Sequence, residues 1–497
     1  QKISKSSFQT KLNMFSKNDI FKSLKWSFLQ QFSIQILSFI VGVVLARILP
    51  VTDFGILGMV YIFNVIGTVL IDSGLSTSII RSKTIDDITL NSIFCANVTF
   101  SFFFYVIIFF LAPIIADFYE QQILILIIRI FCTSLVISSF YTIQKAILTR
   151  DLDFKHIGII SIIAIVISSF VGILMAIYGY GVWSLVSINV INAIISLIIY
   201  YYYSQWRPSF SFSFSVLKEH FYFGYKLLLA NLLDALFSNS SYVIIGKIYN
   251  SYTLGLFTRA DGLRKMVVLG ISTPLKSVLL PILSTIQGNE VKLKTIYIFV
   301  LQIALLLVTP LLLFLIVYAD QIFNLLYGSK WDAAIPFFKI LCLSSILYPL
   351  STYVVSFLNV KGRSDLVLKI ESIKKIALVI AFVITWITKD IYTLLWSLVI
   401  VSIIDFMINV IALNIVLKIT YRFQIKKTVT ALFINLCAIS VLYIFLNIVF
   451  VDYTKSLLAL AIGFVMLPIL NFLFLYSINP KLIFQAKHII LNRDSNL

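Results

Sequence analysis

A group of charged residues stands in an apolar stretch of this sequence, where charge is costly. They lie between positions 254 and 283 and are Arg259, Asp261, Arg264, Lys265 and Lys276. On a helix, Asp261 would lie beside Arg264 and Lys265, three and four positions further on. Such a stripe could bind an anionic head group, or it could be an ion-paired helix end whose long side chains reach water. We name Arg259 and Arg264 as candidate substrate-binding residues.

Four further polar residues occur inside apolar runs. Arg129, in "ILILIIRIFCTSLV", could contact the same ligand or extend to water at the end of its helix. Asp234, in "LLLANLLDALFSNSS", could bind a proton or sodium ion as a coupling site, or pair with a basic residue of the 254–283 stretch. Gln31 and Gln35 share one helical face and could hydrogen-bond sugar hydroxyls or a neighbouring helix. All four are candidate site residues.

The elements that position these residues must be transmembrane helices. The 497 residues are 60% hydrophobic and 12% charged, which is too apolar for a soluble globule. Runs of about 20 apolar residues, long enough to span a bilayer as helices and too long for barrel strands, recur along the chain. We predict an all-α membrane protein with about fourteen spans: Trp26–Leu49, Phe54–Gly74, Thr89–Ala116, Gln122–Ala146, Ile157–Ile177, Val182–Tyr203, Tyr222–Ile248, Leu254–Leu283, Ile296–Tyr318, Ala333–Leu358, Ile370–Ile387, Ile391–Leu417, Val429–Val449 and Ser456–Tyr476.

The basic residues favour one side of these spans. With the N-terminus in the cytoplasm, most Lys and Arg residues outside the spans fall in cytoplasmic segments, as the positive-inside rule requires. The predicted outer segments contain only Arg47, Lys247, Lys330, Lys389 and Lys455. This bias predicts that both termini are cytoplasmic. It also explains the formal net charge of +18 without a nucleic-acid partner.

One corner of the chain occurs twice. "VVLARILPVTDFGIL" (Val43–Leu57) returns 200 positions later as "VIIGKIYNSYTLGLF" (Val243–Phe257). The two copies are six spans apart, an even number, which is typical of parallel repeats. We predict two six-helix lobes related by a pseudo-twofold axis along the membrane normal, plus two C-terminal helices. The expected segments are 1–25 (basic cytoplasmic tail), 26–205 (first lobe), 206–420 (second lobe), 421–480 (extra helices) and 481–497 (cytoplasmic tail).

The residue patterns of enzymes and metal sites are not evident. All three histidines, His156, His220 and His488, fall in predicted cytoplasmic segments, so we expect neither a metal cluster nor a histidine relay inside the membrane. No Walker A pattern occurs. We therefore expect no cofactor, no metal and no catalytic residue, and a protein that is not an enzyme.

Several short motifs resemble one family of membrane proteins, the polysaccharide-synthesis transporters. The family is similar to flippases for lipid-linked oligosaccharides and belongs to the multidrug/oligosaccharidyl-lipid/polysaccharide exporter superfamily. The matching stretches run in family order across about three quarters of the chain. They are "LARILPVTDFGILG" (Leu45–Gly58), "GYGVWSLV" (Gly179–Val186), "WRPSFSFS" (Trp206–Ser213), "LGLFTRA" (Leu254–Ala260), "PLKSVLLPILSTIQ" (Pro274–Gln287), "GSKWDAAIPFFKIL" (Gly328–Leu341) and "GRSDL" (Gly362–Leu366).

The resemblance implies a flippase that moves an oligosaccharide on undecaprenyl diphosphate from the cytoplasmic to the outer leaflet by alternating access. It implies a role in cell-surface polysaccharide biosynthesis, such as O-antigen of lipopolysaccharide, in the bacterial cytoplasmic membrane. Lipid-linked oligosaccharide, membrane lipid and polysaccharide assembly enzymes are the implied partners. The resemblance fixes no binding residue, and Asp261 stands where the family commonly has an aromatic residue.

Two alternative functions remain open. An ion-coupled multidrug exporter of the same superfamily would be expected to have a carboxylate-rich, mostly apolar cavity. A membrane oligosaccharide polymerase or ligase would be expected to have a long outer loop with catalytic Arg or His residues, whereas the longest predicted outer loop covers only residues 319–331.

Overall fold

The computed structural model describes residues 17–72, 75–82, 85–209, 211–286, 288–449 and six positions between 462 and 470. Every regular element in these residues is helical, which confirms the predicted fold class. Ten helices are long and apolar enough to cross a membrane, or eleven if one bent helix pair forms a single span. The chain is a multi-pass membrane protein. The number fourteen stays a prediction, because most of the last predicted span, Ser456–Tyr476, lies outside the described residues.

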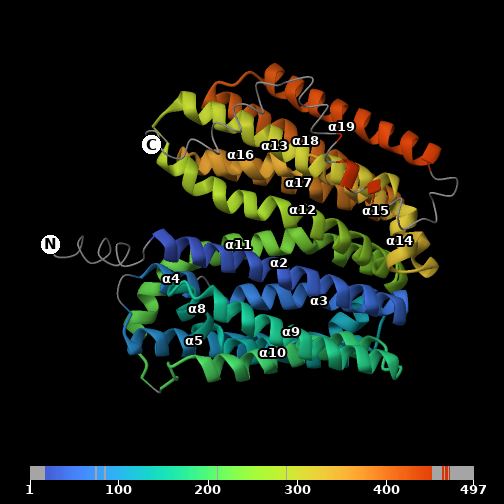
Figure 1. Cartoon of the computed structure of the whole chain (residues 1–497). Helices are drawn as coiled ribbons and strands as arrows, with labels where there is room; N and C mark the ends of the chain where they lie inside the picture. Colours follow the sequence, from blue (N-terminus) through green and yellow to red (C-terminus); the bar gives the residue numbers. More distant parts are fainter. Residues whose placement is uncertain are drawn as a thin grey trace. The chain divides into compact units, whose positions relative to one another are not determined.

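By contacts the chain forms two compact units, Gln1–Thr258 and Arg259–Leu497. The first unit contains α2 (Lys17–Ile48), α3 (Val51–Asp72), α4 (Leu75–Arg81), α5 (Asp87–Tyr119), α6 (Leu124–Phe131), α7 (Thr133–Ser139), α8 (Thr142–Arg150), α9 (Phe154–Ile177), α10 (Val182–Tyr203), α11 (Phe214–Ile248) and the start of α12 (Ser251–Thr285). Within it, α9 packs on α2 and α10, and α3 packs on α5 and α11. Figure 1 shows α9 beside α10.

The second unit contains the rest of α12 and the helices that follow it. These are α13 (Glu290–Val317), α14 (Ala319–Leu326), the 3₁₀ helix η1 (Ser329–Ala334), α15 (Ile335–Ser345), α16 (Tyr348–Val360), α17 (Ser364–Thr388), α18 (Ile391–Leu417) and α19 (Tyr421–Val449). Within it, α18 packs on α15, α16 and α17, and α13 packs on α19. The boundary between the units falls inside α12, whereas the sequence places the boundary between its two lobes at residues 205 and 206. The lobes stay a prediction.

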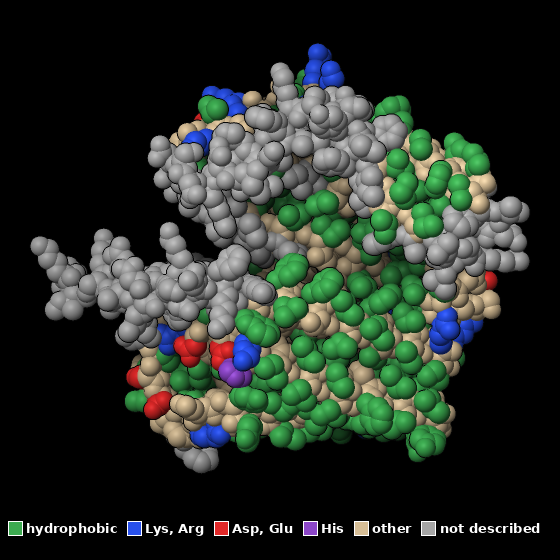
Figure 2. Space-filling model, in the orientation of Figure 1, with side chains coloured by type: hydrophobic (Ala, Val, Ile, Leu, Met, Phe, Trp, Pro, Cys, Tyr) green, Lys and Arg blue, Asp and Glu red, His purple; other side chains and the backbone are tan. Residues whose placement is uncertain are grey.

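Helix α5 illustrates how the chain arranges polar and apolar side chains. Its buried side chains include Asn91, Asn97 and Ser101, while Phe103 and Phe110 are 65% and 71% exposed. A helix of a soluble protein would have the reverse arrangement. The exposed rings therefore suit hydrocarbon, and the polar groups of Asn91 and Ser101 form hydrogen bonds inside the protein. Figure 2 shows apolar side chains over most of the described face, with charged side chains near its edges.

The predicted repeat is present in the helix boundaries. Helices α2 and α11 end at Ile48 and Ile248, and the helices that follow them begin at Val51 and Ser251. Both corners thus turn within two residues, with an offset of 200 positions. This agreement in structure supports the repeat more strongly than the few sequence identities do. The pseudo-twofold axis stays a prediction.

A second pair of loops agrees with an offset of 210 positions. Leu152 precedes α9 and Gly362 precedes α17, and their φ angles are 58° and 70°. The same backbone bond closes both loops at 2.9 Å, from Asp153 N to Leu148 O and from Arg363 N to Leu358 O. The offset therefore grows by ten residues between the two pairs. Helices α14 and η1 occupy this added length, since α5 and α6 are joined directly in the first copy.

Glycine allows the two corners to touch. A Cβ atom on Gly55 would lie 1.7 Å from the backbone oxygen of Ser251, and one on Gly255 would lie 2.1 Å from the backbone oxygen of Val51. Gly55 and Gly255 are equivalent in the repeat, and so are Val51 and Ser251. The first turns of α3 and α12 therefore cross in reciprocal contact, at a distance that only glycine permits.

Two predicted spans, Gln122–Ala146 and Ala333–Leu358, are not single continuous helices, which corrects the sequence prediction. The first is divided into α6, α7 and α8, with a bend of 46° between α7 and α8. Hydroxyl groups compete there for backbone carbonyls, as when Thr142 Oγ1 donates to Ser138 O at 2.9 Å. In the second, α15 ends at Ser345, four residues before Pro349, whose ring would clash with the Ser345 carbonyl. The two broken spans are the fourth and the tenth, and so correspond in the repeat.

Candidate functional site

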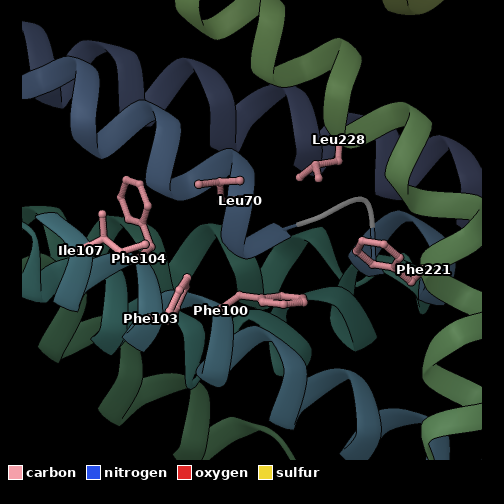
Figure 3. A pocket seen from close by; sticks show the side chains of 7 residues that line it. All are labelled: Leu70, Phe100, Phe103, Phe104, Ile107, Phe221 and Leu228. Carbon is pink, nitrogen blue, oxygen red and sulfur yellow. The ribbon is translucent and has the colours of Figure 1, made fainter.

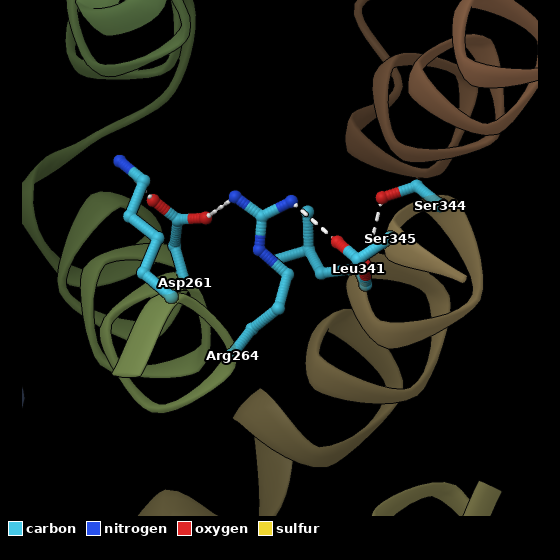
Figure 4. Close-up of polar contacts among 6 residues, drawn as sticks. Asp261, Arg264, Leu341, Ser344 and Ser345 are labelled. Atoms are coloured by element: carbon cyan, nitrogen blue, oxygen red, sulfur yellow. Dashed lines mark hydrogen bonds and ion pairs between the residues drawn. The ribbon is translucent and has the colours of Figure 1, made fainter. Parts of the chain in front are cut away.

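The charged residues of α12 form one connected cluster in the second unit. Asp261, whose side chain is 3% exposed, accepts a hydrogen bond from Arg264 and pairs with Lys265 Nζ at 2.8 Å. Arg264 also donates from Nη1 to the Ser345 hydroxyl of α15 at 2.9 Å. Figure 4 shows the Arg264 guanidinium between Asp261 and Ser345. The helical spacing that predicted the Asp261 contacts is thus confirmed.

Arg259 is held differently, by aromatic rings. Its guanidinium lies 5.3 Å from the ring centre of Tyr327 and 5.7 Å from that of Trp331, both within cation–π range. Tyr327 follows α14, and Trp331 belongs to η1 and is fully buried. The segment that adds ten residues to the second repeat therefore supplies both rings. Rings of this kind fix the position of a cation without neutralising its charge.

The net charge of this part of α12 is positive. Residues 259–265 contain three cations, Arg259, Arg264 and Lys265, and one carboxylate, Asp261, so their formal net charge is +2. Arg264 is 21% exposed and Lys265 is 37% exposed at their side chains. An anionic group with two negative charges, such as a diphosphate, would balance the cluster.

The other candidates belong to the first unit, whereas this cluster belongs to the second. Gln31 is exposed on α2 and Gln35 is half-buried. The Arg129 guanidinium lies 4.1 Å from the ring centre of Phe109, and its Nε donates to the Phe109 carbonyl at 3.4 Å. The roles of these three residues in binding substrate stay predictions.

Asp234 is exposed on α11, and within the described residues it forms no hydrogen bond or ion pair. Its role as an ion-coupling residue also stays a prediction.

The second unit contains a further set of charges, none of which was named as a candidate site residue. They are Glu371 and Lys374 of α17 and Asp405 of α18. Lys374 Nζ and Glu371 Oε1 are 2.7 Å apart. The three-residue spacing of this pair was a usable signal.

Another basic residue inside a predicted span, Lys339, was not named as a candidate site residue. Lys339 of α15 pairs with Asp320 of α14 at 2.6 Å. It corresponds in the repeat to Arg129, because "RIFC" at 129–132 returns as "KILC" at 339–342 with an offset of 210. The offset of 200 that relates the two copies of the first corner does not align Arg129 with Lys339. Interrupted helices at corresponding positions of two repeats are where transporters place their binding sites.

No group of three or more His, Cys, Asp or Glu side chains that could hold a metal ion occurs in the part of the chain that the structure describes.

A cavity of about 270 Å³ lies in the first unit, between α3, α5 and α11. Its lining is apolar and includes Phe100, Phe103 and Phe104 of α5 and Phe221 of α11, as Figure 3 shows. It contains none of the candidate site residues.

Residues 44–336 match the model of a protein family described as "Polysaccharide biosynthesis protein". The match covers more than half of the chain. This chain belongs to that family. The resemblance inferred from the sequence motifs is therefore confirmed.

Curated relatives agree with this assignment. The chain is 24% identical to the teichuronic acid biosynthesis protein TuaB of Bacillus subtilis (strain 168), over 80% of this chain and 83% of that protein. It is also 24% identical to the lipopolysaccharide biosynthesis protein WzxC of Escherichia coli (strain K12), over 72% of this chain and 74% of that protein. Among solved structures, the lipid II flippase MurJ in an inward closed conformation matches with a TM-score of 0.73 and 14% identity, covering 92% of this chain and 99% of that one. This last likeness concerns the fold.

Proposed function

We propose that this protein is a flippase that moves undecaprenyl-diphosphate-linked oligosaccharide from the cytoplasmic to the outer leaflet for cell-surface polysaccharide biosynthesis. The observation that carries the proposal is the cationic cluster on α12, with its excess of two positive charges inside a membrane protein. Charge in such a place is expensive and normally serves a ligand or a coupling step. A lipid diphosphate supplies the opposite charge while its polyprenyl chain stays in the bilayer.

The energetics of the substrate support this function. Each sugar hydroxyl that entered hydrocarbon without a partner would cost a few kcal/mol, so the head group needs a polar path through protein. Two negative charges that move outward across an inside-negative membrane gain about 2.3 kcal/mol each per 100 mV. The membrane potential therefore favours export of a diphosphate.

The proposed function also implies a cellular location and a class of partner proteins. The distribution of basic residues supports a bacterial cytoplasmic membrane location with both termini in the cytoplasm. The relatives are named for teichuronic acid and lipopolysaccharide biosynthesis, which supports polysaccharide assembly enzymes as partners. In this proposal the protein transports its substrate without chemical change and is not an enzyme.

One observation favours a second function. The apolar cavity lined by Phe100, Phe103, Phe104 and Phe221 could hold an apolar drug, as an exporter of the multidrug type would require. No charged side chain lines that cavity, which is the opposite of the α12 cluster. The two candidates therefore predict that different residues control transport.

The test is reconstitution into liposomes with a fluorescent undecaprenyl-diphosphate sugar. We expect Arg264→Gln and Arg259→Gln each to slow flipping by about tenfold to a hundredfold, since each removes a charged contact to the diphosphate. Arg363→Gln is the matched control, because Arg363 pairs with Asp365 in the exposed loop before α17, and it should flip at the normal rate. Unchanged flipping in both α12 variants would overturn the site, and efflux of a cationic dye without glycolipid movement would favour the drug exporter.

A further inference from the structure

The second unit contains a set of ionisable residues that the proposed function does not use. Glu371 and Lys374 lie on α17, and Asp405 lies near the middle of α18. Lys374 Nζ is 2.7 Å from Glu371 Oε1, and Lys374 and Glu371 are both close enough to Asp405 to interact with it electrostatically. An ionisable group near the middle of a spanning helix, as Asp405 is, is rare and typically marks an ion or proton pathway.

The immediate surroundings of Asp405 come from three helices. Asn409, on its own helix, donates from Nδ2 to Asp405 Oδ1 at 3.1 Å, and the Ser351 hydroxyl of α16 lies beside the carboxylate. From α17 it faces Lys374 and Glu371. In the described residues, α13, α15 and α19, which also pack on α18, add no further ionised group to this set.

Two buried side-chain atoms beside Asp405 lack a hydrogen-bond partner, Ser351 Oγ and Asn409 Oδ1. Asn409 is 1% exposed, and its Oδ1 accepts no hydrogen bond. A buried acceptor of this kind normally has a donor. An ionised carboxylate cannot donate, but a protonated one carries an O–H group. The same amide that donates to Asp405 would therefore accept from it once the carboxyl group is protonated.

The charge balance points to the same ligand. Two carboxylates and one ammonium group leave one negative charge in a low-dielectric region, and one proton removes it. Lys374 already provides the cation of the cluster, so a metal ion would compete with its ammonium group. We propose that Glu371, Lys374 and Asp405 form a proton-binding site, with Asp405 as the residue that is protonated and Asn409 as its hydrogen-bond partner.

This site gives the flippase a second driving force. A proton taken from the outer side binds the Asp405 carboxylate, makes the cluster neutral, and is released to the cytoplasmic side when the carboxylate ionises again. The use of the proton in transport rests on the proposed function, whereas protonation of Asp405 does not. The experiment therefore measures the two separately.

Protonation is measured by infrared difference spectroscopy of the purified protein in phosphatidylglycerol-containing liposomes. Exposed carboxylates titrate near pH 4, so the range from about pH 8 to pH 6 reports only unusual groups. We expect a carboxylic-acid C=O band to appear in this range in the wild-type protein and in Asp405→Glu, and to disappear in Asp405→Asn. A wild-type protein without such a band, or an Asp405→Asn variant that retains it, overturns the proposal.

Two further variants sharpen the assignment. Lys374→Met removes the neighbouring positive charge and should move the appearance of the band to higher pH by about 1 to 3 pH units. Asp234→Asn tests the competing carboxylate on α11, and it should leave the band intact. A band that is lost in Asp234→Asn and kept in Asp405→Asn would transfer the site to α11 and overturn the proposal.

Coupling is then measured with the fluorescent undecaprenyl-diphosphate sugar and a pH gradient, acidic outside. The gradient should accelerate flipping by wild-type protein and have no effect on Asp405→Asn. If the gradient accelerates both proteins equally, Asp405 does not couple. If neither protein moves the glycolipid, the proposed function fails while the infrared result still decides the proton site.

Discussion

The two copies of the repeat make one helix contact with different chemistry. In the first unit, Asn64 Nδ2 of α3 donates to the Ser134 hydroxyl of α7 at 3.4 Å. At the position of Asn64, the second unit has Arg264, which donates to Ser345 of α15 at 2.9 Å. Ser345 lies one position beyond Ser344, the residue that corresponds to Ser134 at the offset of 210. A neutral amide suffices to join the two helices. In the proposed function, the charge of Arg264 binds the substrate.

The neighbouring positions extend this difference. Met59, Tyr61 and Val65 of α3 correspond to Arg259, Asp261 and Lys265 of α12 at an offset of 200. The second copy therefore has a charged cluster, together with a carboxylate that partly compensates it, where the first copy has uncharged side chains. Neutral hydrogen bonds between membrane helices contribute about 0.6 kcal/mol on average, whereas buried charges depend strongly on their partners.

The largest effect is expected from removal of the carboxylate. Asp261→Ala leaves Arg264 and Lys265 without their common partner and should destabilise the second unit by about 3 to 5 kcal/mol. Thermal unfolding in detergent measures this loss, and Asp261→Ala with Arg264→Met should recover part of it. A single variant that unfolds at the wild-type temperature would mean that the ion pairs contribute nothing.

The converse change tests the first unit. Asn64→Arg adds a positive charge to α3 without a compensating carboxylate, because Tyr61 occupies the position that corresponds to Asp261. The variant should be less stable than the wild-type protein by about 3 kcal/mol. Adding Tyr61→Asp should restore much of the stability by recreating the three-residue ion-pair spacing. Thermal unfolding of the single and the double variant measures this difference. A double variant that is less stable than Asn64→Arg would contradict the role of the carboxylate as a compensating charge.

The glycine crossing provides a smaller and well-controlled effect. Gly255→Ala would bring a Cβ atom to 2.1 Å from the Val51 carbonyl, and such overpacking should destabilise by about 1 to 3 kcal/mol or more. Gly262→Ala on the same helix meets no atom within 4 Å and should be neutral or stabilising by up to about 1 kcal/mol. Equal unfolding temperatures for the two variants would contradict the close contact.

The smallest effect is expected for the neutral pair. Ser134→Ala removes the acceptor of Asn64 and should cost about 0.6 kcal/mol, measured by the same unfolding assay. Ser345→Ala removes the partner of a charged donor and should cost more, about 1.5 to 3 kcal/mol. Equal stability of the two alanine variants would mean that the neutral and the charged hydrogen bond contribute equally to stability.

Local spacing allowed the sequence to predict part of this site. The Asp261 contacts follow from three- and four-residue helical spacing, and the first corner of the repeat follows from a match at a constant offset. The rings that hold Arg259 could not be predicted, because Tyr327 and Trp331 are about seventy positions away and no local pattern pairs them.

The two helix interruptions that the sequence analysis did not predict are nevertheless indicated by the sequence. Pro349 indicates the break after Ser345, and the serine- and threonine-rich stretch at 133–142 indicates the break before α8. The grouping around Asp405 could not be predicted, because its partners Glu371 and Lys374 lie on another helix. Side chains on different helices meet only through tertiary packing, which a single sequence does not reveal.

The segment α14–η1 makes the second copy of the repeat about ten residues longer than the first. It places the rings of Tyr327 and Trp331 against the Arg259 guanidinium. The corresponding residue of the first copy is Met59, an uncharged side chain that requires no such rings. A difference in length at one end of the repeat is thus linked to a difference in charge on the helix that contacts it.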